Sequence, residues 1–172
     1  MNRALVVLSV LLLSACTPAP TRSPTPAATA TATTTAGPTA VPGGCGDTPL
    51  WTGAAPEWIA SAGGGLGQLP FALSHEGNLY AGLFAQPLRA GADVTNPSNK
   101  ILWISREPRD GQSLRLTLRR TDGTGPVLTQ EEPANSGPGE IYPSIVDVPT
   151  AGCWSVTADW AGHRATLELP WN

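Results

Sequence analysis

Three segments of the chain alternate between apolar and polar residues with a period of two. Leucines alternate with arginine and threonine over 114–118, and the segments 154–160 and 165–171 repeat this alternation with other residues. Successive side chains of a strand point to opposite faces, so each segment predicts a strand with one face in a core and the other in water. No stretch of about twelve or more residues carries an apolar stripe at helical spacing without an intervening Pro or Gly. An all-β domain is therefore expected.

Other apolar segments extend this prediction, and turn-forming pairs such as Asp110-Gly111 and Asp122-Gly123 lie between strand candidates. The further strand candidates are 69–74, 78–85, 100–106 and 142–148. The 18 Pro and 19 Gly among 172 residues argue against a helical bundle or a doubly wound α/β fold. About seven to eight short strands predict a single immunoglobulin-like β-sandwich. Only the architecture is predicted, because the tyrosine that true immunoglobulin domains carry two residues before their second cysteine is replaced by Ala151.

The N-terminus has the pattern of a leader. Arg3 precedes an apolar run over 4–13, which as a helix would reach about 15 Å, half of a bilayer core. Such a run predicts a signal peptide and not a membrane span. It ends in Leu-Ser-Ala followed by Cys16, and here the chain resembles the bacterial lipoproteins. The resemblance implies cleavage before Cys16, lipidation of its thiol, and attachment of the mature protein to the cell membrane or outer membrane on the extracytoplasmic side.

The segment 17–43 is predicted to be a disordered tether. Nine Thr, seven Ala and six Pro make up 22 of its 27 residues, and it contains no aromatic residue. A stretch of this composition cannot bury enough apolar surface to offset the entropy of ordering it. The expected organisation is a signal peptide over 1–15, the lipidated cysteine with its tether over 16–43, and a β-sandwich domain over 44–172.

Two further cysteines, Cys45 and Cys153, lie in the part of the chain that is expected to be exported. An even pair in such a domain favours a disulfide. Cys153 is in phase with the polar residues of 154–160, so it is expected on the outer side of its strand or at the very start of the strand. The bridge would then fasten the N-terminal segment over an edge or end of the sandwich and would not pin its centre.

No constellation of catalytic or metal-binding residues stands out. Neither His75 nor His163 has another His, Asp or Cys at a metal-ligand spacing, and no G-x-S-x-G elbow is present. The acidic residues Glu131, Glu132 and Glu140 suggest a carboxylate pair for glycoside hydrolysis, but a solvated Pro/Gly-rich loop is the favoured interpretation. We therefore expect no catalytic residue, no metal, no cofactor and no enzymatic activity.

Two features suggest a ligand platform. Trp51 and Trp58 lie in an irregular N-terminal segment and are candidates for an exposed aromatic surface, although packing of that segment onto the sandwich is favoured. Arg115 and Arg119 share an outward strand face that could meet an anionic polymer or lipid headgroups. The favoured alternative for this pair is cross-strand pairing with acidic neighbours.

The function expected from these observations is that of a membrane-anchored extracytoplasmic lipoprotein presenting a non-catalytic binding or accessory domain. A nucleic-acid partner is disfavoured because the net charge is −3 and Lys100 is the single lysine. The expected partners are the membrane, through the lipid anchor, and other envelope proteins or an anionic envelope polymer. The alternative is a structural or envelope-assembly role, and a hydrolase is least favoured. The last thirty residues, from Tyr142 through Gly152-Cys153-Trp154 to the final hairpin, are also similar to the closing strands of small extracytoplasmic bacterial domains of no assigned activity.

Overall fold

Strands account for most of the regular structure in a computed structural model that describes residues 37–62, 69–91 and 99–172. The strands are β1 (Thr39–Cys45), β2 (Thr48–Thr52), β3 (Phe71–Leu73), β4 (Leu79–Leu83), β5 (Lys100–Ser105), β6 (Leu114–Arg120), β7 (Leu128–Glu132), β8 (Ile141–Ile145), β9 (Gly152–Trp160) and β10 (His163–Trp171). The helical elements are α1 (Glu57–Ser61) and the 3₁₀-helix η2 (Ala134–Ser136).

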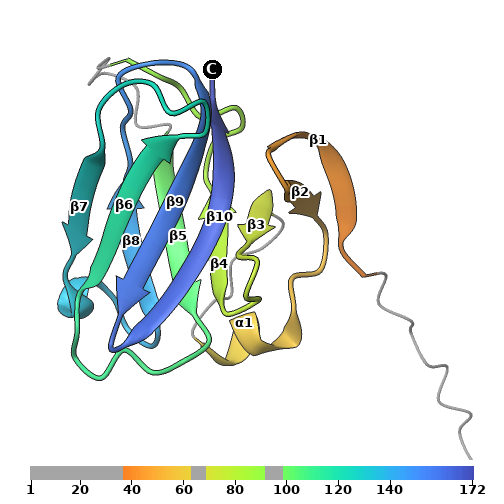
Figure 1. Ribbon diagram of the computed structural model, residues 1–172. Coiled ribbons are helices and arrows are strands. Elements are labelled where there is room, and N and C mark those ends of the chain that lie inside the picture. The colour runs from red at the N-terminus through yellow and green to blue at the C-terminus, as the bar shows by residue number, and fades with distance from the viewer. Residues whose placement is uncertain (1–36, 63–68, 92–98) are drawn as a thin grey trace, which may run out of the picture. The chain divides into compact units, whose positions relative to one another are not determined.

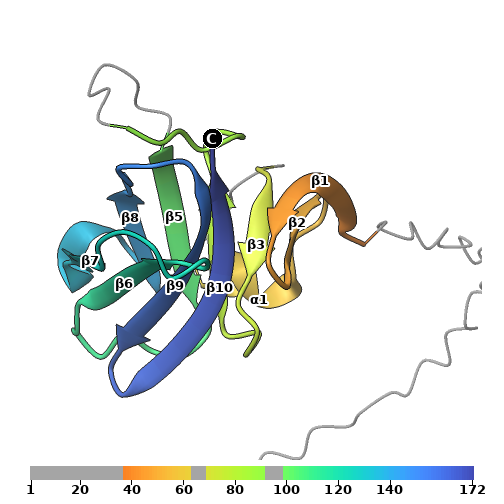
Figure 2. The same ribbon diagram turned by 45° about the horizontal axis from the view of Figure 1, so that its top comes forward.

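The strands form two antiparallel sheets that face each other (Figure 1). The first sheet has the order β1-β2-β3-β4-β5-β8 and the second the order β10-β9-β6-β7. In Figure 2 the strands β7 and β8 lie at one side of the sandwich and β1 and β2 at the other. The predicted β-sandwich is thus confirmed, and its immunoglobulin-like classification stays a prediction.

The core between the sheets follows from the alternation in β6, β9 and β10. In all three strands every second residue is buried, as predicted, while Arg115 and Arg119 are exposed. Tryptophans provide much of the buried volume, and a buried indole N–H needs an acceptor. Trp103 donates to Ser144 Oγ over 2.8 Å, and Trp154 donates to the carbonyl oxygen of Thr150 over 3.0 Å. These bonds fix the ring orientations and so help to specify one packing.

The first sheet is covered on both faces. Its inner residues pack against the second sheet, while Phe71, Tyr80 and Ile104 belong to a second apolar cluster on the outer face. The helix α1 adds the buried Ile59 to this cluster, and Trp58 packs against it. Burial on both faces explains why β4 and β5 are almost continuously apolar, where β6 alternates.

Two assignments expected from the sequence are wrong, the start of the domain and the loop around Glu131. β1 begins at Thr39 and pairs with β2, so the residues 39–43 belong to the sheet and not to the tether. Glu131 and Glu132 lie in β7, which pairs with β6, and not in a loop. Both are edge strands that bury few side chains and are held mainly by backbone pairing, so they lack the apolar alternation of β6, β9 and β10.

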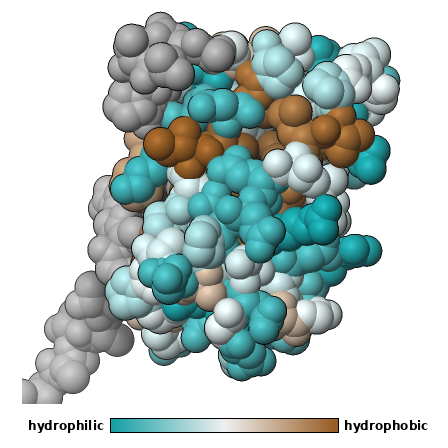
Figure 3. All heavy atoms as spheres, turned by 90° about the vertical axis from the view of Figure 1, so that its left-hand side faces the viewer, coloured by the Kyte–Doolittle hydropathy of each residue, from teal (hydrophilic) through white to brown (hydrophobic). Residues whose placement is uncertain are grey.

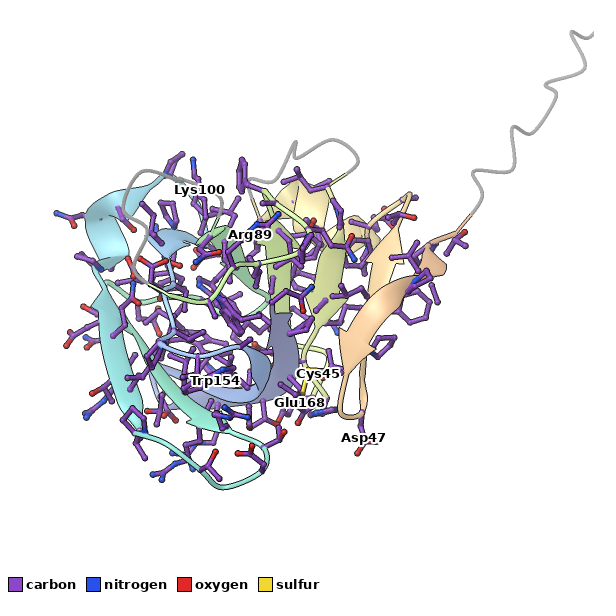
Figure 4. The ribbon with its side chains drawn as sticks, turned by 90° about the horizontal axis from the view of Figure 1, so that it is seen from above. Cys45, Asp47, Arg89, Lys100, Trp154 and Glu168 are labelled. Atoms are coloured by element: carbon purple, nitrogen blue, oxygen red, sulfur yellow. A yellow bond between two sulfur atoms is a disulfide. The ribbon has the colours of Figure 1, made fainter. Side chains whose placement is uncertain are left out.

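The disulfide between Cys45 and Cys153 is present, with a Cα–Cα distance of 5.8 Å. It joins the end of β1 in the first sheet to the beginning of β9 in the second, and both cysteines are half-buried. Figure 4 shows Cys45 close to Glu168 of β10, which lies between the two bridged strands. The expected position at an edge of the sandwich is therefore confirmed.

A chain that begins at Gly44 is expected to be less stable than one that begins at Gly37. It lacks the pairing of Thr39, Ala40 and Val41 with β2, which at the usual net value per hydrogen bond contributes about 1–3 kcal/mol. Urea denaturation of the two chains, both with the disulfide formed, measures the difference. Equal midpoints would mean that the first residues of β1 contribute nothing to the fold and that the domain boundary lies at 44 after all.

Candidate functional site: a cleft beside β1

A cleft of about 400 Å³ lies where β1, the end of β4 and the end of β10 meet. Three leucines, three prolines, two glycines and two amide side chains line it. The leucines are Leu50, Leu83 and Leu88, the prolines are Pro42, Pro87 and Pro170, and the remaining residues are Gly43, Gly44, Gln86 and Asn172. This volume lies within the range of small-molecule sites in proteins.

A bulge in β1 shapes one side of the cleft. The register of β1 against β2 shifts between Val41 and Cys45, which sets Pro42, Gly43 and Gly44 off the regular ladder. Gly43 has a φ of 108°, and a Cβ there would lie 2.9 Å from the Gln86 side-chain nitrogen. Gly43 is therefore required, because another residue would be strained and would displace Gln86, which donates to the Pro42 carbonyl over 3.1 Å.

The opposite side of the cleft, the segment 86–91, is held by the buried Asn99. This side chain accepts from the Arg89 amide over 2.8 Å and donates to the Arg89 carbonyl oxygen and to Asp147, each over 2.7 Å. Backbone bonds with Asn172 tie the same segment to the end of β10, at Leu88 and Ala90. The cleft is thus built from fixed backbone, and a bound ligand would need little rearrangement of it.

The lining determines the kind of ligand that would fit. Among the described residues that line the cleft, none has a charged side chain. Gln86 and Asn172 supply amide donors and acceptors, and the leucines and prolines supply apolar surface. Since an unpaired charge is costly to desolvate, the cleft suits an uncharged and largely apolar ligand that makes a few hydrogen bonds.

The structure does not bring the four predicted platform residues together. Trp51 and Trp58 are half-buried and pack against the apolar cluster on the outer face of the first sheet. Arg115 and Arg119 lie on the outer face of the second sheet, on the other side of the sandwich. For the tryptophans, the favoured alternative of packing onto the sandwich agrees with this arrangement.

The outer face of the second sheet has alternating charges. Arg115 lies in register between Asp159 of β9 and Glu131 of β7. Arg164, opposite Asp159 on the next strand, donates to its carboxylate over 2.7 Å. The next row across the four strands is neutral and consists of Thr166, Thr157, Thr117 and Thr129. Arg115 is thus flanked by acidic residues on both neighbouring strands, whereas Arg119 lies opposite Ser155 of β9.

The free edge of β10 is capped by side chains. His75 Nε2 lies 2.9 Å from Glu168 Oε2, and Thr48 Oγ donates to the same oxygen over 2.6 Å and accepts from the Glu168 amide. The Glu76 carboxylate accepts from the amide and the hydroxyl of Thr166. The side chains of His75 and Glu76 therefore cover the free edge of β10.

The other groups considered for chemistry are dispersed. His163 lies at the β9–β10 turn and packs near Trp160. Glu131 is exposed and Glu132 is buried on β7, while Glu140 accepts from the Arg109 amide over 2.7 Å. Within the described ranges, no group of three or more His, Cys, Asp or Glu side chains is arranged to hold a metal ion.

Glu132 provides a pH-dependent test of the fold. Burial raises the pKa of this carboxyl above its ordinary value of 4.5, against the lowering effect of the hydrogen bond from Gln130. A raised pKa in the folded state means that the protonated form stabilises the fold, and that this stabilisation is lost as the pH rises through the raised pKa. Glu132→Gln is therefore expected to be more stable than the wild type at neutral pH and similar to it below about pH 4.5. Urea midpoints across this range measure the difference, and a variant less stable at neutral pH would contradict it.

The sequence does not predict the cleft. Its only local signals are Pro42-Gly43, at the end of the predicted tether, Gly44, at the start of the predicted domain, and the pair Gln86-Pro87, which directly follows the strand candidate 78–85. A Pro-Gly-Gly run within a strand signals a bulge, but nothing local places it beside β10. The predicted signal peptide, Cys16 and residues 17–36 of the predicted tether lie outside the described residues. In the part of the chain that the structure covers, no helix is long and apolar enough to cross a bilayer.

Comparison with known proteins identifies no family. No family model and no curated protein sequence matches the chain. A solved structure described as a "Putative Lipoprotein from Bacillus anthracis" is similar, with a TM-score of 0.40 and 12% identity, over 69% of this chain and 97% of that one. At this TM-score the likeness does not establish a shared fold.

Proposed function

We propose that the protein is a lipid-anchored extracytoplasmic lipoprotein whose β-sandwich is a non-catalytic binding module. The disulfide supports this proposal most directly. It occupies two of the three cysteines and leaves Cys16, which ends the Leu-Ser-Ala-Cys motif, as the remaining thiol. Disulfides persist in oxidising compartments, which agrees with export directed by the predicted signal peptide.

The cleft beside β1 is the ligand site in this proposal. It combines an apolar lining with two neutral amide side chains, Gln86 and Asn172, and its walls are held by the bulge and by Asn99. The proposed ligand is a small uncharged molecule with a mainly apolar surface.

Replacement of Cys16 by Ser tests the anchor. In cells labelled with an alkynyl fatty acid, the wild type is expected to incorporate label and to fractionate with the membrane. The Cys16→Ser chain is expected to show neither behaviour, because serine offers no thiol to the acyl transferase. Label on the Cys16→Ser protein would contradict the assignment.

The neutral apolar fluorophore N-phenyl-1-naphthylamine tests the cleft. Saturable fluorescence enhancement is expected with the wild type and is expected to be lost in Asn172→Trp, whose indole would occupy the rim of the cleft. Asn172→Ser is the matched control and should retain binding, because Asn172 joins the segment 86–91 through backbone bonds alone. Failure of the wild type to bind, or equal binding by Asn172→Trp, would rule out the cleft as the site.

A further inference from the structure

Three large apolar side chains are exposed at one end of the sandwich. Phe84 is 44% exposed, Val127 is 49% exposed and Ile145 is 56% exposed. Phe84 directly follows β4, Ile145 ends β8, and Val127 directly precedes β7. Figure 3 views the molecule from the side of β7 and β8 and shows apolar side chains in a band across the upper part of this face. We call Phe84, Val127 and Ile145 the apolar band.

Cations lie beside the apolar band. Lys100 pairs with Ile145 across β5 and β8, and its ammonium lies 4.5 Å from the centre of the Phe84 ring. Arg119 and Arg120 line a small depression together with Val127. Arg89, labelled with Lys100 in Figure 4, is bonded through its backbone to Asn99, the residue before Lys100.

Among the described residues near the apolar band, the basic ones outnumber the acidic ones. The basic residues are Arg89, Lys100, Arg119 and Arg120, and the acidic ones are Asp122, Glu132 and Asp147. Asp122 is bonded to Arg120 over 2.6 Å. Lys100 has no acidic residue opposite it in the ladder, whereas Arg115 has one on each side.

From this combination we infer that the end of the sandwich carrying the apolar band docks on an anionic lipid bilayer. Exposed apolar side chains enter the interfacial layer, and neighbouring cations interact with anionic headgroups at about 1 kcal/mol each, or about fivefold in affinity. The surface is too small to bind tightly alone. This inference depends on the proposed lipid anchor at Cys16, since an anchor holds the domain at high effective concentration and makes weak docking sufficient.

The test uses the non-acylated chain from Thr17 to Asn172, which keeps every described residue. Co-sedimentation is measured at low salt and millimolar lipid, with phosphatidylcholine vesicles and with vesicles that also contain about one third phosphatidylglycerol. We expect binding to the anionic vesicles, weaker binding to the neutral ones, and loss of binding as salt is raised. Because this chain carries no lipid, the result is independent of whether Cys16 is acylated.

Paired variants test which surface binds. Lys100→Gln is expected to weaken binding to anionic vesicles about fivefold. Arg106→Gln is the matched control. Arg106 is also exposed and directly follows the other end of β5, so its replacement is expected to leave binding unchanged. Phe84→Ser combined with Ile145→Thr is expected to reduce binding at least tenfold, and unchanged urea midpoints would show that its fold is intact. Absence of binding to anionic vesicles, or equal effects of Lys100→Gln and Arg106→Gln, would overturn the inference.

Discussion

Loss of the Cys45–Cys153 bridge is expected to lower the free energy of unfolding by about 2–5 kcal/mol without unfolding the domain. The bridge joins residues 108 positions apart, and closing a loop of this length is assigned about 4.7 kcal/mol by the chain-entropy model. Native β1 is mostly exposed and pairs only with β2, so it depends on the bridge more than any inner strand does. Urea denaturation of a Cys45→Ala/Cys153→Ala variant measures the loss.

Hydrogen exchange shows where the loss occurs. In the variant, the amides of 39–45 are expected to lose protection, while those of 114–120 and 154–169 stay slow because they lie in the second sheet. Free thiols at both positions in protein from its native envelope would refute the bridge. Uniform loss of protection would instead show that the bridge supports the whole core.

Replacement of Arg109 by Met is expected to cost about 2–4 kcal/mol. The Arg109 side chain is only 13% exposed and donates to the carbonyl oxygens of Ile141, over 2.7 Å, and Gly137, over 3.1 Å. Its guanidinium also lies 3.7 Å from Glu140 and 5.2 Å from the Tyr142 ring. Methionine keeps the apolar stem but leaves both carbonyl groups without this donor and the Glu140 carboxylate without the neighbouring positive charge. The midpoint of urea denaturation measures the cost.

Arg106→Met is the matched control, because Arg106 is exposed and its backbone amide makes the contact with Asn78. A change within about 0.5 kcal/mol is expected for it. Equal midpoints for the two variants would mean that Arg109 does not hold the segment before β8.

Three strands were predictable because one physical requirement dominates them. β6, β9 and β10 bury one face and expose the other, so the pleat imposes its period of two on the sequence. The phase of Cys153 within β9 then predicted the position of the disulfide at an edge. That inference needed only the alternation and the pairing of two cysteines in a part of the chain expected to be exported.

The strands β1 and β7 and the cleft were not predictable in this way. β1 has the sequence TAVPGGC, whose composition is that of the preceding segment, and its place in the sheet depends on backbone bonds to β2. The cleft needs Gly43, Gln86 and Asn172 to meet, and these residues come from distant parts of the chain. Only the tertiary arrangement brings them together. The platform of Trp51, Trp58, Arg115 and Arg119 failed for the same reason, since sequence does not show which sheet a residue belongs to.

The capped edge of β10 bears on how closely copies of the protein can be packed. The outward amides of Thr166, Glu168 and Asn172 are bonded to Glu76, Thr48 and Leu88, and Pro170 has no amide hydrogen to offer. An edge strand with free amides can pair with a strand of another copy and start aggregation. This pairing becomes more frequent when the copies are confined to one surface. Because these amides of β10 are already bonded within the molecule, neighbouring copies can lie close together on a surface without joining sheet to sheet along this strand.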